Sequence, residues 1–461
     1  QPVHTLGRTP MKATPKKVVI CGGVRTPIGH LGKSLAGFLP EDLMEAAVRG
    51  VFQKTSLYPH AVDGVLVGWV GQGSHAPNIA RVTALKAGLP VKAHAYTVQA
   101  NCVSSLETVA SAYRHIVMGE GDLYLAGGTE SMSNFPYAIR GPRSHKKLRS
   151  LETVKAEWAN LWGDAEIAIR DTTEEGLTDP IEKINMAATA EICAQMYSIS
   201  RAAQDKYAFD SYRKGLAGEK TGFYATHVVP VERSGQIVLE KDEYPFLRES
   251  LVEKPKMLEK APTIFDGPSY SIQDFYRDNG SYIQGKTYEE GRSEGTVTLF
   301  NACARSDGAA VVIVCSEERA KDLGLEILAE IYSWGFWGTN PAYMGISPVF
   351  ATNIALERAD LSFGELSHIE LHEAFAATCL SIFRVGKEKF NQDWAAANES
   401  GALNPNGGTL ALGHPLAATG VRLLLNLLYS MKSDPNARFG LSTACASGGL
   451  GGAMILKKYG A

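Results

Sequence analysis

Short runs of β-branched and other apolar residues alternate with longer stretches of helical periodicity along most of the chain. Alternation of this kind predicts an α/β fold. In the first part of the chain, strands are expected at residues 18–21, 65–70, 95–99 and 123–126. Helices are expected between them, at residues 42–52, 78–87 and 102–118.

The alternation stops near Asn134 and resumes near Thr296. Further strands are then expected at residues 309–314, 327–333, 369–371, 441–444 and 453–456. The chain is therefore predicted to have two similar halves, residues 17–133 and 295–461, around an insertion, residues 134–294. The insertion has a helical pattern over residues 187–217 and an aromatic, glycine-rich stretch over residues 265–291. Because structureless loops of this length are rare, we expect a loop domain that covers the active site.

Composition limits the kinds of function that the chain can have. Its 461 residues are 45% hydrophobic, which excludes a mainly disordered chain and is enough for two or three domains. The net charge is only −3, which argues against a nucleic-acid binder. The longest apolar run, residues 421–431, contains Arg422 and Asn426 and is too short to span a bilayer. We therefore expect small molecules or proteins as partners, and a protein that is soluble or at most peripheral to a membrane.

Seven cysteines without a CxxC pair argue against a disulfide framework and favour a reducing compartment. Residues 1–16 are basic and contain no acidic residue, and we expect them to form a flexible tail. Their composition suits the remnant of a mitochondrial presequence, and a merely solvated tail is the alternative. The predicted location is mitochondrial, with a peroxisome-like organelle or the cytosol as alternatives.

Four short segments place reactive side chains where catalysis could use them. Cys102 lies where a predicted strand ends and a helix begins, and the helix dipole is expected to lower its pKa toward neutrality. A free cysteine is also a common core residue, so this segment alone decides nothing. Closely spaced glycines in residues 407–413 would present His414 at a fixed point, although a capped helix start explains them equally well.

The other two segments also lie at strand ends. His372 follows a predicted strand and precedes a helix, a common place for site residues in α/β proteins. Cys445 is followed by a glycine-rich loop, whose backbone N–H groups can approach a ligand closely, as an oxyanion hole requires. Two cysteines and two histidines in such positions are hard to explain as core residues.

In this order the segments resemble the thiolase family, over nearly the whole chain. The resemblance rests on residues 23–27, 101–106, 126–133, 296–310, 372–375, 413–415 and the loop at Cys445. The helical part of the insertion, residues 187–217, is similar to the thiolase loop domain. The resemblance implies two βαβαβαββ halves in a five-layered α-β-α-β-α body, and assembly as a homodimer or tetramer.

The resemblance also implies acyl transfer between coenzyme A and the enzyme, with CoA as cosubstrate and with no metal or permanently bound cofactor. By position, Cys102 is the nucleophile, His414 takes its proton, and Cys445 acts as acid and then as base. His372 and His414 would line the oxyanion hole for C–C cleavage, and the N–H groups of Cys102 and Ser447 the one for the thioester step. Substrate contacts are expected from Cys303, Ala304, Phe375 and Gly448.

Four departures from the usual thiolase pattern refine these expectations, and one of them is Gln99 in place of the Asn that is usual three residues before the nucleophile. Most thiolases have Asn where this chain has His372, and a His there is similar to the thiolase subunit of the trifunctional β-oxidation complex. It favours a 3-ketoacyl-CoA thiolase that degrades fatty acids. Ser447 stands where Gly is usual, and Cys303 stands where Ser is common.

Three other functions are compatible with parts of this pattern. A biosynthetic acetoacetyl-CoA thiolase is the main alternative among enzymes. A decarboxylating condensing enzyme is disfavoured, because it would not need Cys445. A silent thiolase-like lipid carrier is disfavoured, because the chain keeps all four predicted catalytic residues.

The start of the insertion carries a basic cluster, at Arg140, Arg143, Lys146, Lys147 and Arg149. Apolar residues then recur at helical spacing and predict one amphipathic helix. They are Leu148, Leu151, Val154, Trp158 and Leu161. Residues 140–162 are therefore expected to make a peripheral membrane contact or to bind a partner such as a hydratase/dehydrogenase subunit. Packing of the apolar residues onto the insertion itself is the alternative.

Overall fold

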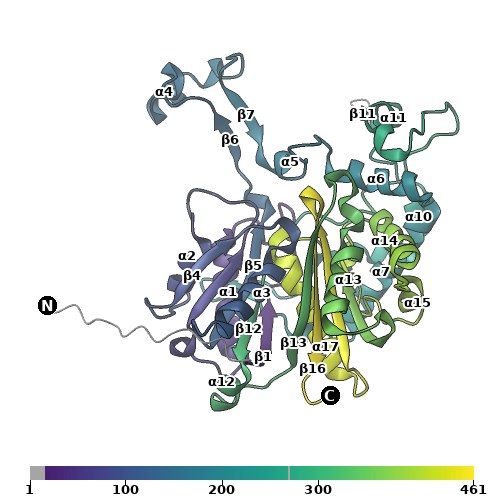
Figure 1. Cartoon of the computed structure of the whole chain (residues 1–461). Helices are drawn as coiled ribbons and strands as arrows, with labels where there is room; N and C mark the ends of the chain where they lie inside the picture. Colours follow the sequence, from purple (N-terminus) through teal and green to yellow (C-terminus); the bar gives the residue numbers. More distant parts are fainter. Residues whose placement is uncertain (1–15, 268–269) are drawn as a thin grey trace.

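The computed structural model describes residues 16–267 and 270–461, and its centre is a ten-stranded mixed sheet (Figure 1). Its main strands are β1 (Val18–Arg25), β3 (Gly64–Gly68), β4 (His94–Val98), β5 (Leu123–Ser131), β12 (Ser306–Ser316), β13 (Ala329–Gly338), β14 (Leu366–Leu371), β15 (Phe439–Ala446) and β16 (Leu450–Lys458). They lie in the order β14-β15-β16-β13-β1-β12-β5-β3-β4, and β2 (Gly29–His30) pairs with the start of β12. Every strand predicted from the sequence overlaps one of these strands.

The sheet has two halves with the same strand arrangement. In the first, β4, β3 and β5 are parallel, and β12 and β1 follow antiparallel. In the second, Leu403 makes a parallel bridge to β14, β14 and β15 are parallel, and β16 and β13 follow antiparallel. A short pairing of β1 with β13 joins the halves.

One predicted boundary needs correction. We expected the second half to begin at residue 295, but β12 lies between β1 and β5 and so completes the first half. The chain enters the insertion before it forms β12, the last strand of the first half, and returns to that half after the insertion. Sequence order alone does not show this, because any apolar strand after the insertion fits either half.

Helices cover the outer faces of both halves and also fill the space between them (Figure 1). Helices α1 (Pro40–Lys54) and α2 (Ile79–Lys86) pack on the first half, and α13 (Ser347–Ala359) and α14 (Ala376–Phe390) on the second. Between the halves, α3 (Ser104–Val117) and α17 (Thr419–Ser433) share one hydrophobic cluster with strands of both. This is the predicted α-β-α-β-α body. The two central helices begin side by side, since the N–H of Val421 donates to Oγ of Ser105 at 2.9 Å.

The insertion packs over one end of this body. Its elements include α5 (Thr172–Gly176), α6 (Met186–Tyr197), α7 (Arg201–Lys220), β8 (Val231–Arg233), β9 (Gln236–Leu239), α8 (Glu243–Leu247), α9 (Glu249–Glu253), α10 (Lys256–Glu259) and α11 (Ile272–Asn279). The helix predicted over residues 187–217 is two helices, because Ser198 takes a left-handed φ of 54° and Ser200 caps α7. Phe265 and Phe275, from the aromatic stretch, share a cluster with Cys445.

The first part of the insertion projects from the body as an arm, residues 137–171 (Figure 1). Strands β6 (Tyr137–Arg140) and β7 (Ala168–Asp171) pair antiparallel at its base. The single amphipathic helix predicted here is wrong, since only α4 (Leu151–Ala156) is α-helical. Leu148 and Leu161 are buried with Ile167 in a small core of the arm, whereas Leu151 and Trp158 are 65% and 50% exposed. Packing onto the β6–β7 hairpin outweighs the local helical periodicity.

Of the tail predicted over residues 1–16, only Lys16 lies within the described residues, and its ammonium pairs with Asp122 at 2.8 Å. Within the described part of the chain, no helix combines the length and apolar character that a bilayer crossing needs.

Candidate active site

Cys102 lies at the turn between β4 and α3, in the first half of the sheet. The turn is a 3₁₀ helix over Asn101–Val103, and Asn101 has a positive φ of 51°. The side-chain amide of Asn101 donates to the carbonyl of Ser447 at 2.9 Å, which ties the turn to the loop that follows Cys445. The thiol therefore stands at the start of a central helix, as the sequence predicts.

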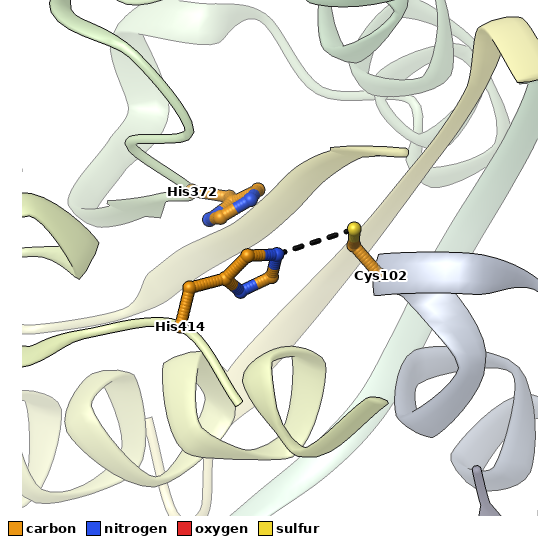
Figure 2. A group of neighbouring side chains, drawn as sticks. All are labelled: Cys102, His372 and His414. Atoms are coloured by element: carbon orange, nitrogen blue, oxygen red, sulfur yellow. Dashed lines mark hydrogen bonds between the residues drawn. The ribbon is translucent and has the colours of Figure 1, made fainter. Parts of the chain in front are cut away.

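His414 occupies the corresponding position in the second half, shortly before α17. It follows α16 (Thr409–Leu412) and Gly413, whose φ is 98° and where a Cβ would overlap Oγ of Ser306. The backbone N–H of His414 donates to the carbonyl of Ala304 at 2.9 Å and to Oγ of Ser306 at 3.0 Å. These contacts hold Nε2 of His414 3.2 Å from Sγ of Cys102 (Figure 2).

His372 and Cys445 complete the group. His372 directly follows β14, and its ring centroid lies 4.3 Å from that of His414. One side-chain atom from each of Cys102, His372 and His414 lies within 4.8 Å of the other two (Figure 2). Cys445, near the end of the neighbouring strand β15, is buried and faces the same cavity. The fold thus brings together all four residues that the sequence predicted as catalytic.

The cavity that these residues share has a volume of about 170 Å³ and a mainly apolar lining. Ser447, Cys303, Ala304 and Phe375 also line it, so their predicted contacts with substrate are sterically open. Gly448 is exposed and does not belong to the lining. One wall comes from the insertion, through Gly176, Leu177, Asn185, Met186, Ala187 and Ile264.

The loop after Cys445 accepts Ser447 in place of a glycine without backbone strain. The positive φ values fall on Gly448 and Gly449, at 77° and 79°, and Ser447 is not among the described residues with positive φ. The backbone N–H groups of Ser447 and Cys102 both lie close enough to the Cys102 sulfur to lower its pKa, although burial outweighs them. They are therefore placed to donate to the oxygen of a thioester formed there.

Burial keeps the reacting groups uncharged in the free protein. Burial raises the pKa of the Cys102 thiol to about 12, so the lowered pKa that we predicted from the helix start is wrong. Burial, aided by the charge of Arg422, lowers the pKa of His414 to about 3. Burial and the neighbouring His414 likewise hold the pKa of His372 well below its usual value. Burial also raises the pKa of Cys445 well above its usual range.

Sequence analysis did not single out two threonines and a glutamate that support these residues. Oγ1 of Thr409 lies 3.0 Å from Nδ1 of His372, and Oγ1 of Thr419 lies 2.7 Å from Nδ1 of His414. The carboxyl group of Glu130 ties the loop of His414 to the first half by accepting from the N–H groups of Val70, Gly71 and Ala417. Glu130 lies in a segment that carries the thiolase resemblance, and the two threonines flank the segment of His414, but only the fold shows what these residues touch.

Cys102, His372 and His414 form the group that could hold a metal ion among the described residues. Two imidazoles and a thiolate are a ligand set that suits zinc. The charge of Arg422 acts on both imidazoles and opposes a second cation there. The arrangement is better suited to nucleophilic chemistry, because a thiol with an imidazole base, a second thiol and converging N–H donors define a cysteine-dependent acyltransferase.

Comparisons with known proteins agree with this class. Residues 18–268 match the model of the N-terminal thiolase domain, and residues 325–458 match that of the C-terminal thiolase domain. The probable acetyl-CoA acyltransferase of Staphylococcus aureus (strain COL) is 34% identical over 96% of this chain and 99% of its own length. The probable acetyl-CoA acetyltransferase of Escherichia coli (strain K12) is 34% identical over the same shares of the two chains.

Solved structures agree as well. The acetyl-CoA acetyltransferase of Bacillus anthracis superposes with a TM-score of 0.80 at 31% identity, covering 97% of this chain and 100% of that one. Human mitochondrial 3-ketoacyl-CoA thiolase in complex with CoA superposes with a TM-score of 0.79 at 30% identity, and the match covers 96% of this chain and 98% of that one. This chain belongs to the thiolase family and is an acyltransferase.

Proposed function

We propose that the protein is a degradative 3-ketoacyl-CoA thiolase, an acetyl-CoA C-acyltransferase of fatty-acid β-oxidation. The observation that carries the proposal is the placement of Cys102 3.2 Å from Nε2 of His414, with His372 and Cys445 in the same cavity. The first pair supplies a nucleophile and its base. The second pair supplies an oxyanion donor and an acid for the departing enolate.

In the first half-reaction, Cys102 attacks the 3-keto carbon of the substrate while its thiol proton passes to Nε2 of His414. The C–C bond then breaks, leaving the acyl group on Cys102 and the enolate of acetyl-CoA. Cys445, held as a thiol by burial, gives its proton to the enolate carbon. Acetyl-CoA leaves, and Cys445 is left as a thiolate.

In the second half-reaction, the Cys445 thiolate takes the thiol proton of free CoA. The CoA thiolate attacks the carbonyl of acyl-Cys102, whose oxygen faces the N–H groups of Cys102 and Ser447. Cys102 leaves as a thiolate and recovers its proton from His414. The products are a shortened acyl-CoA and the enzyme in its starting protonation state, so CoA is a cosubstrate and no permanently bound cofactor is required.

A biosynthetic acetoacetyl-CoA thiolase is the alternative, because the same residues run the reaction in both directions. His372 favours the degradative assignment, whereas the likeness to the human mitochondrial 3-ketoacyl-CoA thiolase is matched by the likeness to the acetyl-CoA acetyltransferase of Bacillus anthracis. Thiolysis should be measured with CoA over a chain-length series of 3-ketoacyl-CoAs, beside condensation of acetyl-CoA. Efficient thiolysis of medium or long chains supports the proposal, and activity confined to acetoacetyl-CoA supports the alternative. A lipid carrier would show neither activity and no acyl group on Cys102.

We also propose a homodimer or tetramer, association with a hydratase/dehydrogenase subunit, and a mitochondrial location. The family resemblance motivates all three. Mass photometry of the purified protein tests the first, co-purification of the full-length protein from its own cells tests the second, and a fluorescent fusion tests the third.

We further propose that the arm makes a peripheral contact with an anionic membrane. Leu151, Trp158 and Trp162 are between 50% and 67% exposed on it, and interfacial tryptophans are typical of membrane-surface segments. Among the described residues, three basic side chains of the arm have no ion pair: Arg143, Lys146 and Arg149. Basic side chains without an ion pair, beside exposed tryptophans, suit anionic headgroups. Each basic residue near the surface contributes about 1 kcal/mol to the free energy of membrane binding.

Vesicles that contain cardiolipin test this contact. Reversal of Arg143, Lys146 and Arg149 to Glu should abolish binding without affecting thiolysis of a soluble substrate. A matched control reverses Lys33, Lys92 and Lys389, which are exposed on the body. Equal binding by both triple variants and the native protein would contradict the proposal.

A further inference from the structure

A buried chain of hydrogen bonds leads from α17 to His372. One guanidinium nitrogen of Arg422 donates to Oγ1 of Thr409 at 2.6 Å. The same Oγ1 lies 3.0 Å from Nδ1 of His372. Thr409, Arg422 and His372 are at most 1% exposed, and Glu370 lies opposite the guanidinium at 3.9 Å. Solvent therefore does not compete with the contacts in this chain.

The chemistry of the partners fixes the direction of these hydrogen bonds. A guanidinium can only donate, so the hydroxyl oxygen of Thr409 accepts from Arg422. The hydroxyl proton of Thr409 is then free, and Nδ1 of His372 is the acceptor within reach. The opposite arrangement, with a proton on Nδ1, would leave the hydroxyl proton of Thr409 without an acceptor, and Thr409 does not line the cavity, whereas a proton on Nε2 belongs to a ring that lines the cavity, where water or substrate can accept it. Nδ1 of His372 is therefore the acceptor, and its Nε2 carries the proton.

His414 shows the opposite arrangement. The hydroxyl of Thr419 donates to the carbonyl of Pro415 at 3.2 Å, so its proton is already used. Its oxygen lies 2.7 Å from Nδ1 of His414 and is left to accept a proton from it. Nδ1 of His414 is therefore protonated, and its Nε2, which faces the Cys102 sulfur, is the free base.

We infer that Thr409 and Arg422 are positioning residues that hold His372 in the Nε2–H tautomer, while Thr419 holds His414 in the Nδ1–H tautomer. This rests on the proposed function and gives the two imidazoles of one cavity different tasks. His372 can donate to an oxyanion but cannot act as the base toward the substrate. His414 can take the thiol proton but becomes a donor only afterwards.

The free Nε2 of His372 has the surroundings that this task needs. It is buried and has no hydrogen-bond partner among the described residues, and its ring lines the catalytic cavity. Its pKa is held well below the usual value by burial, by His414 and by Arg422, so the ring is neutral and the tautomer decides what it does. Arg422 thus acts on His372 in two ways, through the Thr409 hydroxyl and through its charge.

The tautomers can be read without any activity. In protein labelled with ¹⁵N-histidine, NMR distinguishes a protonated ring nitrogen from an unprotonated one, and His372→Asn and His414→Asn assign the signals. We expect the proton on Nε2 of His372 and on Nδ1 of His414. In Thr409→Val, the signals of His372 should become those of mixed tautomers while those of His414 stay unchanged. The same tautomer for both rings in the native protein would overturn the inference.

Kinetics of the two half-reactions give the second test. Thr409→Val should lower kcat for C–C cleavage between about 10-fold and 10²-fold, less than loss of a whole donor, with KM nearly unchanged. Acyl exchange between thioesters, which uses the N–H groups of Cys102 and Ser447, should be nearly spared. Thr409→Ser, which keeps the hydroxyl, should retain cleavage, and Thr409→Val should add little to a His372→Ala variant. Thr419→Val should impair both half-reactions, because His414 serves both.

Thr352→Val is the matched control, since the hydroxyl of Thr352 is buried and has no partner within the described chain. Equal losses in both half-reactions of Thr409→Val, together with a lowered melting temperature, would mean that Thr409 is only structural. C–C cleavage at the native rate in Thr409→Val would overturn the inference and leave the proposed function intact. Absence of thiolysis by the native protein, with the NMR result as expected, would instead remove the proposed function.

Discussion

Sγ of Cys102 lies 3.2 Å from Nε2 of His414, although 312 residues separate them in the chain. Each residue stands just before the start of a central helix, one from each half of the sheet. Their distance therefore depends on how closely the starts of α3 and α17 pack. Because burial keeps the thiol protonated and the imidazole neutral, the pair is uncharged until substrate binds.

The first prediction is a flat pH profile for acylation of Cys102. The base form of His414 is required, and with a pKa of about 3 it persists well below neutral pH. The Cys102 thiol, with a pKa of about 12, stays protonated up to strongly alkaline pH. Single-turnover acylation at saturating acyl-CoA should therefore show no inflection between about pH 5 and about pH 9. An inflection near neutral pH would show that one of the two groups titrates there and would contradict these pKa values.

The second prediction concerns Cys445. Cys445→Ala should lower thiolysis by about 10²–10⁴-fold, because a positioned acid and base is lost. Labelled acyl-CoA should still acylate Cys102 in this variant, whereas Cys102→Ala should take up no label at all. Mass spectrometry of the labelled peptides locates the acyl group. Normal turnover by Cys445→Ala would favour a condensing enzyme, and label on another cysteine would contradict the role of Cys102.

The third prediction concerns the contact between the two central helices. A Cβ at Gly420, near the start of α17, would lie 2.8 Å from the backbone nitrogen of Leu106 in α3. Gly420→Ala should therefore push the helix starts apart, lower the free energy of unfolding by about 1–3 kcal/mol and reduce thiolysis. Gly364→Ala, where the new Cβ meets nothing within 4 Å, is the control. Native activity and melting temperature in Gly420→Ala would show that the contact does not set the distance between Cys102 and His414.

The fourth prediction concerns Glu130. Burial, only partly offset by three backbone N–H donors, raises the pKa of its carboxyl group from 4.5 to about 7. The folded protein therefore holds a proton that the unfolded chain releases between these values, and the free energy of unfolding falls as pH rises through this range. The shift corresponds to a loss on the order of 3 kcal/mol.

Glu130→Gln cannot ionise and should lack this part of the pH dependence. Urea unfolding of both proteins at about pH 5 and about pH 8 measures the difference between them. Parallel pH dependence in the two proteins would mean that Glu130 is ionised throughout this range. Thiolysis by the variant reports separately on the loop of His414, which Glu130 holds through Ala417.

The sequence determined much of this protein because its signals are local. Short runs of apolar residues predicted all nine main strands. A strand that is buried on both faces needs consecutive apolar residues wherever it lies in the sheet. The segments around Cys102, His372, His414 and Cys445 were recognisable for a similar reason. A turn that presents a side chain at a strand end needs glycines or a helix start within a few residues.

Local patterns failed where a distant contact outweighed them. The apolar spacing over residues 148–161 predicts a helix, but Leu148 and Leu161 instead pack on a hairpin whose strands lie on either side of them. The helix start at Cys102 predicts a lowered pKa, but burial in the folded protein raises it.

Only the tertiary structure decided which strand completes which half, and which atoms meet in the cavity. The return of β12 between β1 and β5 depends on pairing across the whole insertion. The tasks of His372 and His414 depend on two threonine hydroxyls, one already accepting from Arg422 and the other already donating to Pro415. Neither choice is written in a local pattern, because the direction of a hydrogen bond is set by every partner that reaches it, and those partners come together only when the chain has folded.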